Sequence, residues 1–220
     1  MKPYYCSVRL RSDATFGRGE GVAGLVDVEI EQDQYGFPTM SGRVLKGLLQ
    51  EEWQNLRYAL GEPKVKQWDA AASTLFGQPG ALLEGAAAML VGAATLPPEL
   101  IAAVREQQLD RAEVLASLTT IRRQTAIDAK SGAPERGSLR AFRVLLRETP
   151  MIAPLDFEDE PSEATLALLA ACVLAVRRGG SVRNRGRGRL ALLLHDHLPE
   201  DYNDAEFTKT QFQRFAKGVQ

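Results

Sequence analysis

Residues 165–194 read TLALLAACVLAV (165–176), RRGGSVRNRGRGR (177–189) and LALLL (190–194), and this stretch decides the fold. The first segment predicts a buried helix and the last a strand, because both are uninterrupted apolar runs of suitable length. The middle segment, called the Gly/Arg loop below, holds six arginines and four glycines without an acid. Glycines let the backbone come close to a ligand, and unpaired backbone N–H groups can form a concave anion site. Arginine guanidinium groups bind phosphate oxygens with two parallel hydrogen bonds. We therefore predict a structured phosphate-binding loop, the alternative being a solvated basic loop.

Hydrophobic spacing on either side of this stretch predicts the other elements. The expected strands are 4–11, 84–94, 118–127 and 141–155, and the expected helices are 42–58 after Ser41, 67–76, 99–108 and 110–117. Without the middle segment the order is strand, helix, strand, strand, helix, strand. This is the ferredoxin-like βαββαβ plan of RNA-recognition domains. The sequence thus predicts an α+β fold, one domain over 1–198 with a helical and hairpin-like insertion at about 95–141, and a polar tail over 199–220.

Composition limits the class of protein. An apolar content of 45% is ordinary, and 220 residues are enough for one good core. Cys6 and Cys172 lie far apart in apolar surroundings, which indicates neither a disulfide framework nor a zinc site. We expect a cytoplasmic protein without a membrane partner, because the longest apolar run is too short to span a bilayer. Although the net charge of the chain is −1, residues 119–147 are strongly basic, with seven basic and two acidic residues.

Four further motifs occur in a defined order. Asp27 and Asp33 lie in a loop before SGRVLKG (41–47), LFG follows at 75–77, and TAIDAKSGA (125–133) precedes GSLR (137–140) and the Gly/Arg loop. Together these motifs resemble the RAMP superfamily of CRISPR effector proteins, and above all the Cas seven family of backbone subunits in type III complexes. The resemblance covers residues 4 to 195. It departs from the family pattern at TMSG (39–42), at Ala129 and at TFGR (15–18).

The resemblance implies guide-RNA contacts at three places. At the start of the helix over 42–58, Ser41, Arg43 and Lys46 would hold guide-RNA phosphates, which agrees with the free N–H groups and the anion field of a helix N-terminus. In the Gly/Arg loop, Arg183, Arg185 and Arg187 would follow the same RNA backbone. On the inserted segment, which forms a thumb in the family, the expected contacts are Arg122, Arg123, Arg136 and Arg140. Arg18 is a further candidate from the early loop. For each group the alternative is a solvated surface.

Asp27 is the expected catalytic residue, because the resemblance implies that one Asp in this loop cuts target RNA. A carboxylate near the scissile phosphate can bind a divalent ion, Mg or Mn, or take the proton of the attacking 2′-hydroxyl. Glu29 and Glu31 share a face with Asp27 and are expected to be solvated or to assist a metal. The alternative role of Asp27 is to cap a turn.

The implied function is a guide-RNA-binding backbone subunit of a type III effector complex that also cleaves target RNA. Its partners would be guide RNA, target RNA, and the other RAMP and large subunits. The alternatives are a scaffold with a silent Asp27, a guide-processing endonuclease of the same superfamily, and a subunit that caps the guide.

Overall fold

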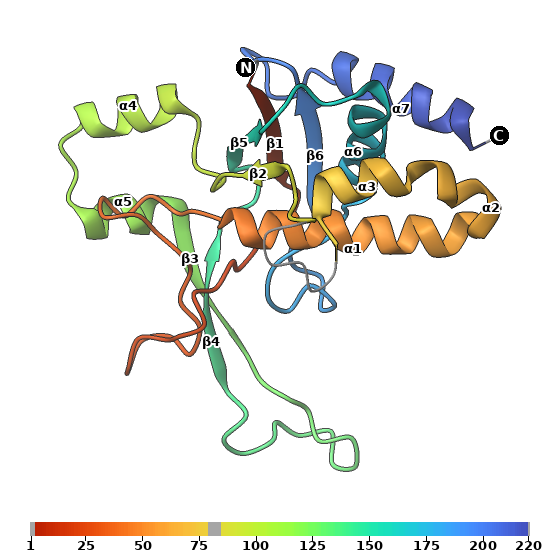
Figure 1. Ribbon diagram of the computed structural model, residues 1–220. Helices are drawn as coiled ribbons and strands as arrows, with labels where there is room; N and C mark the ends of the chain where they lie inside the picture. Colours follow the sequence, from red (N-terminus) through yellow and green to blue (C-terminus); the bar gives the residue numbers. More distant parts are fainter. Residues whose placement is uncertain (1–2, 79–84, 220) are drawn as a thin grey trace.

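The computed structural model describes residues 3–78 and 85–219, and its elements are shown in Figure 1. The strands are β1 (Tyr4–Leu10), β2 (Met89–Val91), β3 (Thr119–Gln124), β4 (Arg140–Leu145), β5 (Pro150–Phe157) and β6 (Leu190–His195). The helices are α1 (Gly42–Leu60), α2 (Glu62–Val65), the 3₁₀ turn Lys66–Trp68, α3 (Asp69–Phe76), α4 (Pro98–Glu106), α5 (Arg111–Leu118), α6 (Glu163–Ala175) and α7 (Glu206–Gly218).

The main sheet has four antiparallel strands in the order β2–β5–β1–β6. This is the ferredoxin-like order, so the expected α+β fold is confirmed. The central strand β1 pairs with β5 from Tyr4↔Leu155 and with β6 from Tyr5↔His195. Every second residue of β1 is buried, including Cys6, Val8 and Leu10, because these side chains face the layer formed by α1, α3 and α6.

The helix α6 is apolar on all sides because it is covered on all sides. Its residues from Thr165 to Val173 are buried, and it packs against β6, α1, α3 and α7. The Ser162 hydroxyl begins the helix by accepting a hydrogen bond of 3.1 Å from the Thr165 N–H. The helix ends just before the Gly/Arg loop, which is thereby fixed between a buried helix and a buried strand.

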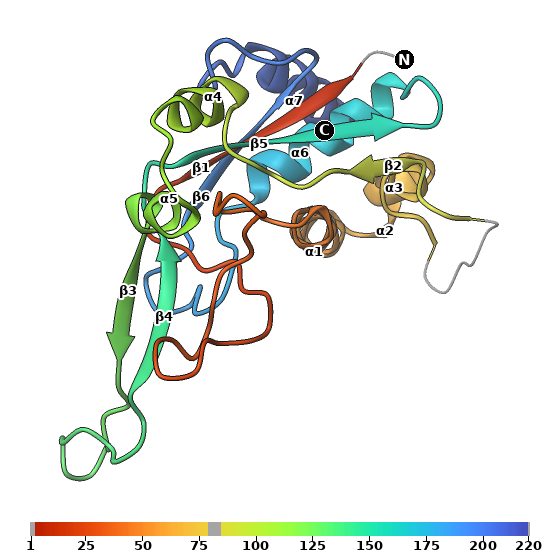
Figure 2. The same cartoon turned by 90° about the vertical axis from the view of Figure 1, so that its left-hand side faces the viewer.

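The segment between β2 and β5 leaves the main sheet and carries α4, α5 and a hairpin of β3 and β4. The hairpin runs in register from Thr119↔Leu145 to Gln124↔Arg140. It projects away from the body of the molecule, on the same side as the Gly/Arg loop (Figures 1 and 2). A small second core of Phe37, Leu96 and Val114 packs against apolar residues of α4 and the end of α5.

Two predicted strands differ in the structure. Residues 141–155 are not one strand, because β4 pairs with β3 while β5 pairs with β1 and β2. The chain turns between them at Glu148, whose φ is 65° and whose N–H donates to the Leu10 carbonyl. The inserted segment is therefore residues 96–149, because Thr95 still pairs with Ile152 of β5; it begins close to the expected residue 95 and ends later than the expected residue 141. The strand expected over 84–94 contracts to Met89–Val91, and Glu84 lies outside the described residues.

The expected polar tail is largely a helix of the domain. In α7 the residues Thr208, Gln211 and Phe215 are buried at a spacing of three and four, which places them on one face. Phe215 packs against Trp68 with ring centroids 4.7 Å apart, and α7 covers α6. Within 3–78 and 85–219, no helix is long and apolar enough to cross a membrane.

Candidate nucleic-acid interface

The Gly/Arg loop is folded tightly on itself. The Gly179 N–H donates to the Gly188 carbonyl at 2.9 Å, and the Ser181 N–H donates to the Thr15 carbonyl at 2.8 Å. A Cβ at Gly188 would lie 2.0 Å from the Gly179 carbonyl oxygen, so only glycine fits there. The glycines thus serve close contacts within the chain. These N–H groups, which the sequence suggested as anion donors, are already paired.

The three predicted arginines of this loop take different environments. Arg183 forms a two-pronged ion pair with Glu51 of α1, with both N–O distances 2.8 Å. This hydrogen bonding lowers the pKa of the Glu51 carboxyl. Arg187 lies over the Phe142 ring at 5.8 Å. Arg185 is exposed and reaches toward the hairpin.

A cavity of about 360 Å³ lies between the loop and the outer half of the hairpin. It is lined by Gln124, Thr125, Ala126, Glu135, Arg136, Gly137, Ser138, Arg140 and Arg185. The structure thus brings three of the predicted RNA-binding arginines together from positions about 45 residues apart in sequence. Among the described residues that line the cavity, Glu135 is the only acid. Concave surfaces of one sign focus the electrostatic field, so this cavity suits a phosphate chain.

Arg122 and Arg123 are neighbours on β3 and are both exposed. Arg122 pairs with Asp13 at 2.9 Å, whereas Arg123 has no ion pair within the described residues 3–78 and 85–219. Arg122 also lines a second cavity near the base of the hairpin, together with Arg187. That cavity includes Arg11 and Arg147, neither of which the sequence singled out as a contact. In the sequence, Arg11 and Arg147 are each a single arginine just after a strand. Only the tertiary structure, which brings the ends of β1 and β4 together, places them in one cavity.

The N-terminus of α1 is less open than the sequence suggested. Ser41 begins the helix, but its side chain makes no capping bond, and its N–H donates to Glu31 Oε2 at 3.0 Å. Gly42 is required because a Cβ there would lie 1.8 Å from the Val91 carbonyl oxygen. Lys46 donates from Nζ to the Met89 carbonyl at 3.0 Å, and burial lowers its pKa. Arg43 alone is exposed and faces outward.

Asp27 lies beside the outer half of β4. Its Oδ2 accepts a hydrogen bond of 2.6 Å from the Ala141 N–H, and its Oδ1 lies 3.6 Å from Arg140 Nη1. The side chain is 42% exposed, so it remains accessible to a ligand. Asp27 and Arg140, predicted separately, are therefore one cluster. Arg18 is exposed, and its N–H donates to the Glu29 carbonyl in the same loop.

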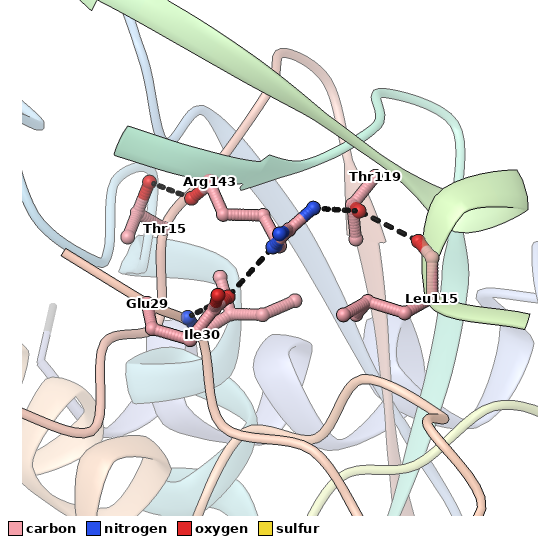
Figure 3. Close-up of polar contacts among 6 residues, drawn as sticks. All are labelled: Thr15, Glu29, Ile30, Leu115, Thr119 and Arg143. Carbon is pink, nitrogen blue, oxygen red and sulfur yellow. Dashed lines mark hydrogen bonds and ion pairs between the residues drawn. The ribbon is translucent and has the colours of Figure 1, made fainter. Parts of the chain in front are cut away.

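Glu29 is not solvated, contrary to the expectation from its alternation with Asp27. Its carboxylate accepts a hydrogen bond of 2.8 Å from Arg143 Nε, and Arg143 Nη1 reaches the Thr119 hydroxyl at 3.4 Å (Figure 3). The side chains of Glu29 and Arg143 are only 3% and 12% exposed. This buried pair fastens the 12–40 loop to β4 and fixes the position of Asp27.

The carboxylates near Asp27 do not form a metal centre. Glu29 is held by Arg143 in a buried ion pair, and Glu31 Oε2 accepts a hydrogen bond from the Ser41 N–H. No group of three or more His, Cys, Asp and Glu able to hold a metal occurs in the described part of the chain. The expected Mg or Mn therefore does not fit a site built by the protein alone, and Asp27 could offer it only one ligand.

Solved structures share this fold. The chain is similar to one in a cryo-EM structure of the type III-B Cmr-beta complex bound to cognate target RNA. Its TM-score is 0.59 at 14% identity, over 86% of this chain and 96% of that chain. A chain in the apo state of Cmr-beta gives a TM-score of 0.56 at 16% identity, with the same coverage. No family model and no curated protein matches the sequence.

At 14–16% identity, these likenesses show a shared fold.

Proposed function

We propose that this chain is an RNA-binding backbone subunit of a type III CRISPR effector complex, of the RAMP superfamily, that holds guide RNA and assembles with other subunits. The observation that carries the proposal is the cavity where Arg136, Arg140 and Arg185 converge, on a fold shared with Cmr-beta subunits. Arginine forks bind phosphate without reading bases, so binding is independent of sequence. Base pairing by the guide then supplies the specificity.

Replacing Arg136, Arg140 and Arg185 together with alanine tests this proposal. The variant should bind single-stranded RNA more weakly, whatever the RNA sequence. The slope of log affinity against log salt should shrink by about 2, because each lost phosphate contact removes about 0.7. The measurement is RNA binding by fluorescence anisotropy over a series of salt concentrations.

A matched control replaces Arg57, Arg105 and Arg214 with alanine, which removes the same charge away from the cavity. Those arginines contact Glu62, Tyr35 and Glu163, and none lines the hairpin cavities. If the slope of log affinity against log salt shrinks equally in both triple variants, RNA binding depends on the net charge of the chain and not on this cavity. An unchanged slope in the cavity variant would exclude the cavity as the RNA site.

We also propose that Asp27 makes the chain the target-RNA endoribonuclease of the complex. An exposed carboxylate held by a backbone N–H is fixed enough to take the proton from a 2′-hydroxyl. That oxygen then attacks the adjacent phosphorus, the P–O5′ bond breaks, and the leaving O5′ takes a proton from solvent water. The products are a 2′,3′-cyclic phosphate and a 5′-hydroxyl. Participation of Mg or Mn remains a prediction, and no step above depends on it.

Asp27→Asn is the sharpest variant for this second proposal. The amide oxygen can still accept from the Ala141 N–H, so the loop keeps its position while the proton acceptor is lost. Target cleavage by this subunit in the assembled complex should stop, and target binding should persist. The measurement is a cleavage ladder on labelled target RNA.

Asp33→Asn is the control in the same loop, because the Asp33 carboxylate accepts hydrogen bonds from the Tyr35 and Phe37 N–H groups, which an amide oxygen can also accept. It should leave the ladder unchanged. If the band assigned to this subunit persists at the wild-type rate in Asp27→Asn, the chain is a scaffold with a silent Asp27.

A further inference from the structure

Arg140 connects the cavity between the Gly/Arg loop and the hairpin with the proposed catalytic residue. Its side chain lines that cavity, and its Nη1 lies 3.6 Å from Oδ1 of Asp27. Both side chains are well exposed, Arg140 at 61% and Asp27 at 42%. A phosphate of RNA in this cavity therefore has a guanidinium and a carboxylate within reach at one place.

The backbone fixes these two groups relative to each other. Residues 27–29 run alongside β4 in the parallel sense, and the Asp27 N–H donates to the Ala141 carbonyl at 2.8 Å. Arg140 directly precedes Ala141 and is held by strand register opposite Gln124 of β3. The pair is thus in place before a substrate binds, as electrostatic stabilisation of a transition state requires.

Most donors of Arg140 are free for a ligand. The contact with Asp27 uses one nitrogen, and the guanidinium makes no other ion pair or hydrogen bond within residues 3–78 and 85–219. Arg183 differs, because Glu51 engages two of its nitrogens at 2.8 Å. Arg140 can therefore bind a phosphate through two parallel hydrogen bonds while it stays beside Asp27.

We propose that Arg140 is a second catalytic residue for RNA cleavage. The proposal rests on the proposed function, in which Asp27 takes the proton of the attacking 2′-hydroxyl. As O2′ bonds to phosphorus, negative charge builds up on the non-bridging oxygens, and N–H groups of Arg140 donate hydrogen bonds to them. Arg140 neither gives nor takes a proton. The 2′-hydroxyl proton goes to Asp27, the P–O5′ bond breaks, and O5′ takes its proton from solvent water.

The test uses the complex assembled with guide RNA, in excess over labelled target RNA, so that a single turnover is followed. Arg140→Ala should lower the cleavage rate at saturation by about 10²-fold, as the loss of one preorganised donor to a transition-state oxyanion does. Target binding should lose one phosphate contact, which reduces the slope of log affinity against log salt by about 0.7. Arg140→Lys keeps the charge without the fork, so it should recover part of the rate.

Arg57→Ala is the matched control, because it removes the same charge from α1, where Arg57 pairs with Glu62. It should leave the saturated rate and the salt slope as in the wild type. An equal loss of rate in Arg57→Ala and Arg140→Ala would overturn the proposal, since the effect would then follow the net charge of the chain.

A sulfur substitution in the target separates contact with the phosphate from an effect through Asp27. A phosphorothioate at the scissile position replaces one non-bridging oxygen by sulfur, which is a weaker acceptor. The wild type should cleave one of the two stereoisomers more slowly than the phosphate. This difference should vanish in Arg140→Ala, because the oxygen and the guanidinium interact directly. Additive effects of sulfur and alanine would mean that Arg140 only positions Asp27, and they would overturn the proposal.

Two outcomes separate this proposal from the proposed function. If Asp27→Asn stops cleavage while Arg140→Ala keeps the wild-type rate at saturation, Arg140 is a binding residue only, and the proposed function stands. If Asp27→Asn itself cleaves at the wild-type rate, the catalytic roles of Asp27 and Arg140 both fail.

Discussion

Ion pairing decides which arginines of this chain are available to a ligand. Arg183 is held by Glu51, whereas Arg185, two residues later, has no ion pair within the described ranges 3–78 and 85–219. Arg143 is held in a buried pair with Glu29 and so serves the fold. A high content of arginine in a segment therefore does not show which of its arginines can bind a ligand, because some are held in ion pairs within the chain. The partners that remove arginines from the surface come from loops and helices more than 100 residues away in sequence.

Glu51→Gln should strengthen RNA binding, because Glu51 occupies the fork of Arg183 with a carboxylate where a phosphate could lie. One more available contact should steepen the salt slope by about 0.7. Both side chains are well exposed, so the free energy of unfolding should change by less than about 1 kcal/mol. Paired measurements of RNA anisotropy and chemical denaturation check this. Weaker RNA binding in Glu51→Gln would mean that the ion pair itself holds the loop in its binding position.

At the scale of elements, the hairpin and the 12–40 loop act as one unit. The Asp27 and Val28 N–H groups donate to the Ala141 carbonyl, and Glu29 pairs with Arg143 two residues along β4. The loop has no helix or strand of its own, and these contacts give it a defined place. The position of Asp27 therefore depends on a buried ion pair beside it.

Glu29→Gln should lower the free energy of unfolding by about 3–5 kcal/mol, because it leaves Arg143 buried without a counterion. Glu29→Gln combined with Arg143→Met should recover most of this loss, since the unpaired charge is then removed. Arg214→Gln is the surface control, and it should cost less than about 1 kcal/mol. Urea denaturation measures all three. Equal stability of the single and double variants would show that the pair is not the fastening contact.

The sequence predicted those helices and strands whose hydrophobic pattern is complete within their own segment of the chain. The apolar run of α6, the spacing of Leu45, Leu48 and Leu49 in α1, and the stop of α3 at Gly77 were all sufficient signals. The break between β4 and β5 was missed although Pro150, the first residue of β5, marks it, because proline lacks the N–H that a continuous paired strand needs. The helix α7 was missed although its buried residues Thr208, Gln211 and Phe215 recur at helical spacing, because two of the three are polar and leave a weak hydrophobic pattern.

The sequence predicted which residues belong to the candidate site, but it did not predict how they are arranged in space. The sequence indicated Arg136, Arg140 and Arg185, and the structure gathers them in one cavity. It could not indicate Arg11 and Arg147, whose proximity depends on the ends of β1 and β4. Nor could it show that Lys46 donates to the Met89 carbonyl. These are tertiary contacts, which no local spacing encodes.

At the scale of the whole molecule, the ferredoxin-like core carries three projecting segments on one side. The hairpin, the Gly/Arg loop and the 12–40 loop all extend to this side (Figures 1 and 2). They come from three distant parts of the sequence, and each is anchored by the core or by its neighbour. The central claim is that single-stranded RNA runs between the hairpin and the Gly/Arg loop.

A cryo-EM structure of this chain assembled with guide and target RNA tests that claim most directly. The account predicts RNA phosphates within hydrogen-bond distance of Arg185 and of Arg136 or Arg140, with the target backbone passing Asp27. The apo positions of the loop and the hairpin should be largely kept, because both are fastened to the fold. RNA that binds elsewhere, for example on the sheet face opposite α1 and α6, would contradict the account.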